Sequence, residues 1–258
     1  MIVQKYRKTQ KMQRSVWDEK TFVNERGTEV IKELFNDGYF SYPKSIFTIK
    51  RILELSTNPN DIILDFFAGS GTTGHAVMQL NAEDGGNRKF ILCQIDEPID
   101  KSKPAFQFCK DNGLEPIISS ITIERLNRAG EKIIQEINEE GKQQIPDIGY
   151  KGFDSVDAPQ LEVQDGQIIF PEISKDTMSR IYNMILTVGL DAPTQIPEEV
   201  VTDSVYKIGN HYYITNSERV SKEDFSNVIK SGSVFIDGWT ATLNGTMQHY
   251  KEEVKIVF

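Results

Sequence analysis

The fold of this 258-residue chain is decided by the stretch Ile62-Ile63-Leu64-Asp65-Phe66-Phe67-Ala68-Gly69-Ser70-Gly71-Thr72-Thr73-Gly74-His75-Ala76-Val77. An apolar run ends on an acidic residue, a loop rich in glycine and hydroxyl side chains follows, and a helix continues from the loop. An α/β sheet forms a cradle for a nucleotide-like ligand in this way, at the carboxyl end of a strand. The stretch therefore predicts an α/β domain with a ligand site at this loop.

The elements around this stretch alternate between helix and strand. Apolar spacing predicts helices over residues 27–35, 45–56 with Ser45 as the N-cap, 72–80, 103–112 and 124–140, and strands over 62–66, 90–95 and 117–121. The strands are apolar on both faces, which is typical of a parallel sheet covered by helices on both sides. Right-handed crossovers would place the second strand beside the first and the third beyond it. We therefore expect part of a doubly wound, Rossmann-like sheet, whose first strand has a free edge that needs a cover.

The pattern of predicted elements changes after a linker at 146–159. The run from Leu161 to Phe170 has Asp165-Gly166 between two alternating segments, which predicts a hairpin. A helix over 174–188, a second hairpin over 205–215, a short helix over 224–230 and a strand over 233–237 follow. We expect two domains, 1–150 and 151–258, the second a small α+β domain.

Composition excludes several classes of protein. The net charge of −9 argues against tight nucleic-acid binding by this chain alone, although basic residues gather in positions 1–51, where a solvated surface is the simpler interpretation. No apolar run approaches the roughly 20 residues that span a bilayer, and no signal-like start is seen, so the prediction is a cytoplasmic protein without membrane contact. Cys93 and Cys109 are predicted to be buried free thiols, and no metal site is expected.

The loop narrows the choice of ligand. Gly69-x-Gly71-x-x-Gly74 with Asp96 about 20 residues later matches a dinucleotide fingerprint, which leaves a nicotinamide-dependent oxidoreductase as one alternative. An acidic strand end at Asp65, however, suits a cationic amine. Hydroxyls and free N–H groups at Thr72-Thr73 suit a carboxylate. A ligand with both groups indicates the amino-acid end of S-adenosylmethionine.

A family resemblance agrees with this ligand. Asp65-Phe66-Phe67-Ala68-Gly69-Ser70-Gly71-Thr72-Thr73 resembles the cofactor motif of amino-group DNA methyltransferases of the β class. The continuation through His75–Asn81 and Glu83-Asp84-Gly85-Gly86-Asn87-Arg88-Lys89-Phe90-Ile91-Leu92 resembles the modification subunit of type III restriction–modification systems. Phe40-Ser41-Tyr42-Pro43-Lys44-Ser45 is similar to the Tyr-Pro-Lys-Pro segment of that family, with Ser45 in place of the second proline. Glu124–Ala129 and Asp147–Tyr150 fit more loosely.

The resemblance implies roles for the matched positions. Phe67, Gly69 and Gly71 would lie under the cofactor, Asp65 would face its amino group, Thr72 and Thr73 its carboxylate, and Lys44 and Ser45 would close the methionine end. The family has an acid that binds the ribose hydroxyls at the end of the second strand. Gln94 stands at that position here, and Asp96 and Glu97 lie just beyond it. We favour Asp96 as the ribose-binding residue. The predicted cofactor site is Lys44, Ser45, Asp65, Phe66, Phe67, Ala68, Gly69, Ser70, Gly71, Thr72, Thr73, Gln94 and Asp96. Simpler interpretations remain for Lys44 and Asp96 as surface charges, His75 as a structural residue, and Trp17 and Trp239 as packing anchors.

The sequence lacks the catalytic counterpart of this loop. Enzymes that methylate the adenine amine use an Asp-Pro-Pro-Tyr-type loop to hold the extruded base, yet here no two prolines are adjacent and none follows an aspartate. In the type III order that loop precedes the cofactor motif. The resemblance therefore implies the C-terminal, cofactor-binding part of a DNA adenine-N6 methyltransferase, inactive alone, with no catalytic residue of its own. Its partners would be DNA, an upstream methyltransferase half, and a restriction subunit or second modification subunit. The alternative is a non-catalytic assembly module that completes a separate upstream half.

Overall fold

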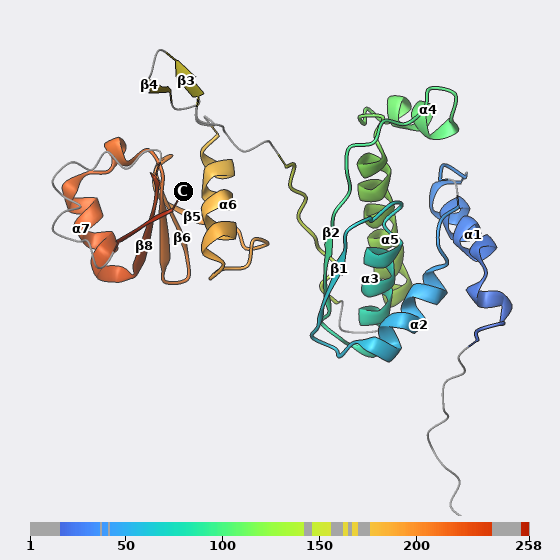
Figure 1. Ribbon diagram of the computed structural model, residues 1–258. Helices are drawn as coiled ribbons and strands as arrows, with labels where there is room; N and C mark the ends of the chain where they lie inside the picture. The colour runs from blue at the N-terminus through green and yellow to red at the C-terminus, as the bar shows by residue number, and fades with distance from the viewer. Residues whose placement is uncertain are drawn as a thin grey trace, which may run out of the picture. The chain divides into compact units, whose positions relative to one another are not determined.

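The computed structural model describes residues 16–36, 38–40, 42–141, 146–155, 162–164, 167–169, 176–238 and 254–257. The chain divides into two compact units, Met1–Gly149 and Tyr150–Phe258 (Figure 1). This boundary lies one residue before the predicted one. Each unit is described by itself below.

The first unit is mixed α/β. Its elements are η1 (Lys20–Phe22), α1 (Asn24–Phe35), α2 (Ile46–Ser56), β1 (Ile62–Asp65), α3 (Thr72–Asp84), β2 (Lys89–Leu92), α4 (Pro104–Asp111) and α5 (Ile118–Glu139). Strands β1 and β2 pair in parallel, from Ile62 opposite Lys89 to Asp65 opposite Leu92. The prediction that the second strand lies beside the first is confirmed.

The core of this unit covers one face of the two strands. Helices α2 and α3 pack together through Ile46, Leu53, Ala76, Val77 and Leu80, and Ile63 and Phe90 contact this cluster. On the other face, side chains remain open to solvent: Ile62 is 64% exposed, Leu64 49% and Ile91 51%. The expectation that both strand faces are buried is therefore wrong within the described part of the unit, because helices cover one face there (Figure 1).

The predicted third strand at Ile117–Ile121 is wrong. Helix α5 begins at Ile118, and this segment keeps one isolated bridge, between Pro98 and Ile117. The buried positions Ile121, Arg125 and Ala129 continue at helical spacing from the start of α5. The apolar run therefore belongs to the helix that packs on α3, and in the described residues β1 and β2 pair with each other alone.

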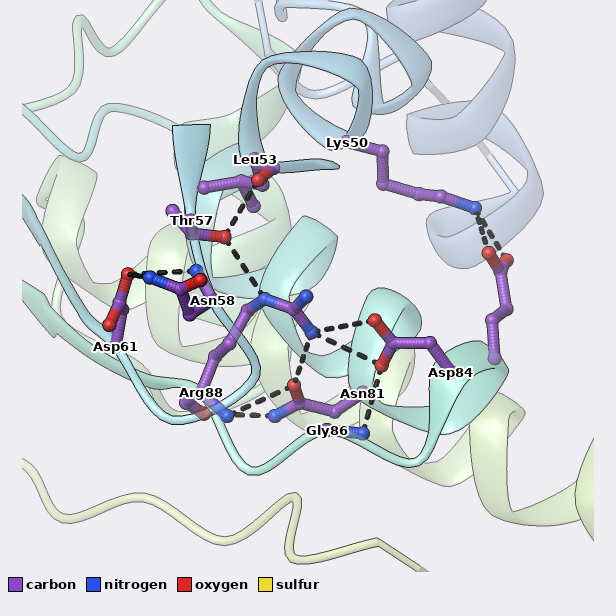
Figure 2. A network of polar contacts seen from close by, with 10 residues as sticks. Lys50, Leu53, Thr57, Asn58, Asp61, Asn81, Asp84, Gly86 and Arg88 are labelled. Atoms are coloured by element: carbon purple, nitrogen blue, oxygen red, sulfur yellow. Dashed lines mark hydrogen bonds and ion pairs between the residues drawn. The ribbon is translucent and has the colours of Figure 1, made fainter. Parts of the chain in front are cut away.

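A buried polar network joins the end of α3 to the start of β2 (Figure 2). The side chain of Asn81 donates from Nδ2 to the Arg88 carbonyl at 2.8 Å and accepts from the Arg88 N–H at 3.1 Å. The Arg88 guanidinium, 6% exposed, donates to Thr57 Oγ1 at 3.0 Å and pairs with Asp84 at 2.9 Å. The Asp84-Gly85-Gly86-Asn87 turn is thus closed by Arg88, and the C-terminal end of α2 is held in the same network.

The second unit contains a five-stranded mixed sheet in the order β5-β6-β7-β8-β9. Its elements are β3 (Glu162–Gln164), β4 (Gln167–Ile169), α6 (Thr177–Val188), β5 (Glu198–Val201), β6 (Val205–Ile208), β7 (His211–Ile214), η2 (Ser217–Arg219), α7 (Lys222–Ser231), β8 (Ser233–Asp237) and β9 (Val254–Val257). Strands β5, β6 and β7 form an antiparallel meander, and β8 and β9 add in parallel. The two predicted hairpins are confirmed as β3–β4 and β6–β7.

Helices cover both faces of this sheet. One apolar cluster joins α6 to Tyr206, Tyr213 and Phe235, and another joins α7 to Tyr212 and Ile236 (Figure 1). Strands β5 and β9 have no counterpart among the predicted elements. The second unit is therefore a helix–sheet–helix arrangement, more layered than the expected small α+β domain.

The two cysteines differ in burial, so the prediction that both are buried is right for one of them. Cys109 is buried as predicted, and burial raises the pKa of its thiol, whereas Cys93 is exposed because it follows β2 on the uncovered face. Trp17 packs against Phe22, with ring centroids 5.5 Å apart. Trp239 and the basic residues at 5–14 lie outside the described residues. No helix among the described residues has the length and apolar character that crossing a membrane requires.

Candidate functional site

The loop between β1 and α3 has the backbone of a ligand cradle. Gly69 and Gly71 adopt left-handed conformations, with φ of 52° and 74°, which glycine adopts without the steric cost of a side chain. Gly71 is the N-cap of α3, so the first N–H groups of the helix, from Thr72 onward, have no intrahelical partner. This loop therefore offers free donors at the positive end of a helix dipole.

Asp65 organises the start of the loop. Its Oδ1 accepts from the Phe67 N–H at 3.0 Å, and its Oδ2 accepts from the Thr73 hydroxyl at 2.6 Å. The carboxylate is thus fixed at the carboxyl end of β1, half-buried, where it can receive a cationic amine. The Thr73 hydroxyl is engaged by Asp65 in this arrangement; its predicted role toward a ligand carboxylate stays a prediction.

The end of β2 holds the other side of the loop. The Ala68 N–H donates to the Cys93 carbonyl at 3.0 Å, and the Gly69 N–H donates to Gln94 Oε1 at 2.8 Å. Gln94 therefore stands beside the cofactor loop, but its carboxamide oxygen supports the backbone. Asp96 is exposed two residues further on, where it accepts from the Ser119 hydroxyl at 2.9 Å. The choice of Asp96 as the ribose residue stays a prediction.

The segment before α2 reaches the same loop. The Phe40 ring lies 3.9 Å from where a Cβ on Gly69 would stand. Ser45 occupies the N-cap position of α2 as predicted, yet its buried hydroxyl donates to the Thr21 carbonyl at 3.0 Å instead of capping the helix. Lys44 is exposed. Of the two predicted methionine-end residues, Lys44 has no side-chain partner among the described residues, and the Ser45 hydroxyl holds η1. The role of both toward a ligand stays a prediction.

Helix α5 forms the floor of the loop. The Thr122 hydroxyl donates to the Gly69 carbonyl. Arg125 Nη1 donates to the Ser70 carbonyl at 3.1 Å, the Ser70 hydroxyl at 2.8 Å and the Thr72 hydroxyl at 2.7 Å. A Cβ on Gly71 would come within 3.1 Å of Thr122 Cγ2, so the loop is seated directly on this turn of the helix.

The floor carries a buried positive charge. Arg125 is fully buried, and within the part of the chain that the structure describes its Nε and Nη2 have no hydrogen-bond partner. It forms no ion pair with an acid of the described residues, and burial lowers its pKa to about 9, so it remains charged at neutral pH. His75 lies in the first turns of α3, its Nδ1 has no hydrogen-bond partner among residues the structure describes, and its pKa is lowered by burial and by the charge of Arg125. His75 is therefore neutral.

Sequence reasoning missed Thr122 and Arg125. Arg125 lies in Glu124–Ala129, a string that resembles the family but to which the resemblance assigns no role, and Thr122 lies just before it. The available signal was the position of Arg125 on the apolar side of a helix, three residues after Thr122 and one before Leu126. Two aromatic residues of the predicted site, Phe66 and Phe67, are 66% and 89% exposed, so both are accessible from solvent.

The loop geometry, with an acidic strand end and a glycine turn into a helix N-terminus, is typical of α/β proteins that bind nucleotide-like ligands. Residues 1–102 match the DNA methylase family of N6 and N4 methyltransferases. The chain is 44% identical over 110 residues to the type III restriction-modification enzyme StyLTI Mod subunit of Salmonella typhimurium, covering 43% of this chain and 16% of that protein.

Further relatives are of two types. The type II methyltransferase M.KpnI of Klebsiella pneumoniae is 43% identical over 114 residues, which cover 44% of this chain and 26% of that protein. The EcoPI Mod subunit of Escherichia phage P1 is 32% identical over 154 residues, 60% of this chain and 22% of that protein. The resemblance to type III modification subunits is thereby confirmed for the N-terminal part. The chain spans between 16% and 26% of the length of these three relatives.

Proposed function

We infer that this chain is the S-adenosylmethionine-binding part of a DNA adenine-N6 methyltransferase of the type III kind, built on a doubly wound sheet. The carrying observation is the loop from Asp65 to Thr73: a fixed carboxylate at one end and the open N-terminus of α3 at the other. These two features suit the amine and the carboxylate of one ligand. The buried cation of Arg125, which forms no ion pair with the acids that the structure describes, adds to the fit with an anionic group.

When bound, S-adenosylmethionine supplies the methyl group that an attacking amine accepts. The residues of this chain bind and orient that donor: Asp65 receives the amino group, the N–H groups of Thr72 and Thr73 receive the carboxylate, and Lys44 closes the methionine end. Asp96 serves the ribose. The contribution to rate is proximity and orientation, without acid–base chemistry from this chain.

A second polypeptide segment completes the catalytic unit in this proposal. The sequence holds no Asp-Pro-Pro-Tyr-type loop for the adenine. The uncovered face of β1 and β2 carries Ile62, Leu64 and Ile91, which are 49% to 64% exposed. An apolar sheet face next to the cofactor loop is suited to packing against the half that holds the base. The second unit would contact a restriction subunit or a second modification subunit, a role taken from the relatives alone.

Two measurements test the proposal. Calorimetry with S-adenosylhomocysteine and with NAD separates a methyltransferase site from a nicotinamide site: we expect binding of the former, and binding of NAD alone refutes the proposal. Incubation with labelled S-adenosylmethionine and varied DNA duplexes should give no methyl transfer by the chain alone. Co-expression with an upstream half should restore it. Transfer by the isolated chain would show that the adenine-binding loop is not missing.

A further inference from the structure

One buried charge near the loop has no acidic counterpart in the described part of the chain. Arg125 is among the largest fully buried side chains described, and its Nη1 donates to three atoms of the loop region. Its Nε and Nη2 have no acceptor among the described residues. A buried arginine normally pairs with an acid, because removing its charge from water is costly. The described residues provide none here.

Hydrogen bonding alone does not require this residue. The hydroxyl of Thr122 already holds the Gly69 carbonyl from the same helix face. A neutral donor at position 125 could serve the Ser70 carbonyl in the same way. What a guanidinium adds is a permanent positive charge under the N-terminus of α3, and its effect is strong because the surroundings exclude water.

The positive charge of Arg125 and the dipole of α3 both favour an anion at the N-terminus of that helix. The first turn of α3 presents unpaired N–H groups, and His75 in that turn is held neutral by burial and by Arg125. The Asp65 carboxylate, the nearest acid of the loop, is bound by Thr73 and Phe67 instead. Because the Thr73 hydroxyl donates to Asp65, this carboxylate lies beside the first turn of α3. The N–H groups of that turn and the charge of Arg125 favour an anion, and Asp65 favours a cation.

We propose that Arg125 is a positioning residue that seats the loop Gly69–Thr72 and whose buried charge makes the site select a ligand with a carboxylate at the N-terminus of α3. This rests on the proposed function, since S-adenosylmethionine carries that carboxylate. Arg125 does not touch the ligand: its donors end on Ser70 and Thr72, and it acts through them.

The test compares two ligands that differ by the carboxylate alone, S-adenosylmethionine and decarboxylated S-adenosylmethionine. Binding of each to the full chain is measured by calorimetry. Arg125→Met removes the loop hydrogen bonds and the charge together, so it should weaken both ligands, and it should weaken S-adenosylmethionine by about a further tenfold or more. Arg125→Lys, which keeps the charge, should retain most of the discrimination. Arg125→Gln repeats the neutral comparison with a polar side chain if the methionine variant does not fold.

Two variants on the same helix serve as references. Thr122→Val removes a loop hydrogen bond without changing charge, so it should weaken both ligands by the same factor. Lys132→Met removes an exposed positive charge that pairs with Glu33, and it should leave both affinities unchanged. Together they separate loosening of the loop from loss of the buried charge.

The outcomes distinguish this proposal from the proposed function. Equal weakening of both ligands by the neutral Arg125 variants, or equal affinity of the parent chain for both, overturns charge selection while the cofactor site stands. Failure of the parent chain to bind either ligand overturns the cofactor site, and the role of Arg125 with it. Unequal weakening by Thr122→Val would show that loop seating alone produces the discrimination.

Discussion

The network between α3 and β2 predicts a large loss of stability in Asn81→Ala. The side chain of Asn81 forms two buried hydrogen bonds with the backbone of Arg88, at 2.8 and 3.1 Å (Figure 2). Alanine leaves that N–H and that carbonyl unsatisfied, at about 1–3 kcal/mol each. Its higher helix propensity returns roughly 0.5 kcal/mol. The free energy of opening at β2 should therefore fall by about 2–5 kcal/mol.

Native-state hydrogen exchange of the β2 amides, Lys89–Leu92, measures this free energy locally and avoids mixing the unfolding of the two units. Gln79→Ala is the matched control, because Gln79 lies on the same helix and donates to Glu83 at 3.1 Å in an exposed pair. It should cost less than about 0.5 kcal/mol. A loss below about 1 kcal/mol in Asn81→Ala would mean that water replaces the two bonds, and would refute the reasoning.

Other predictions concern both units. Gly27→Ala places a Cβ 2.3 Å from a backbone carbonyl oxygen, so urea unfolding should show a loss of about 1–3 kcal/mol or more, and a neutral result would disprove the close approach. Asp237→Asn weakens a buried pair with Arg180, 2.7 Å long, and should cost up to about 3–5 kcal/mol, against less than about 1 kcal/mol for the exposed Asp203→Asn. Burial and a hydrogen bond raise the pKa of Tyr213, so the folded state favours the phenol. Stability should thus be full below pH about 10 and fall above it, less steeply in Tyr213→Phe, as pH-dependent urea unfolding will show.

The parts of the fold that were predictable have strong local signals. Strand β1, the loop and α3 follow from an apolar run and two glycines that need a left-handed backbone. The hairpin β6–β7 follows from its Gly209-Asn210 turn. The prediction of a strand at Ile117–Ile121 was wrong because a short apolar run has no periodicity that distinguishes a strand from a buried helix turn. Packing against α3 is what makes this segment the first turn of α5.

Both strands that the sequence did not predict, β5 and β9, are the edges of the five-stranded sheet. Strand β5 is largely exposed and starts with Glu198 and Glu199, and β9 pairs with β8 alone. An edge strand has one hydrogen-bonded neighbour and less buried surface, so charged side chains are tolerated there and the alternating pattern is lost. Tertiary pairing, which sequence spacing does not contain, creates these elements.

The candidate site was predictable where it is local and unpredictable where it is not. The loop residues are consecutive, and the resemblance covers them. Arg125 lies 53 residues after Thr72, and arginine is among the residues least expected to be fully buried. Its residue type alone favours the solvent-exposed face of α5, although its spacing from Ile121 and Ala129 places it on the apolar face. Its position under the loop depends on the packing of α5 against α3. The Ser45 hydroxyl likewise depends on a long-range contact, because it donates to the Thr21 carbonyl of η1 instead of capping α2.

These observations explain how the proposed site is held in place. Helix α3 is fastened at its N-terminus by α5, through Arg125 and Thr122, and at its C-terminus by Asn81 and the network around Arg88. Helix α3 is thirteen residues long, which corresponds to about 20 Å. The two fastenings use different partners, so the donors at the helix N-terminus stay fixed relative to Asp65 even if the far end opens. A site that must meet an amine and a carboxylate on one small ligand requires this rigidity at its own end of the helix, and the buried arginine is where this chain supplies it.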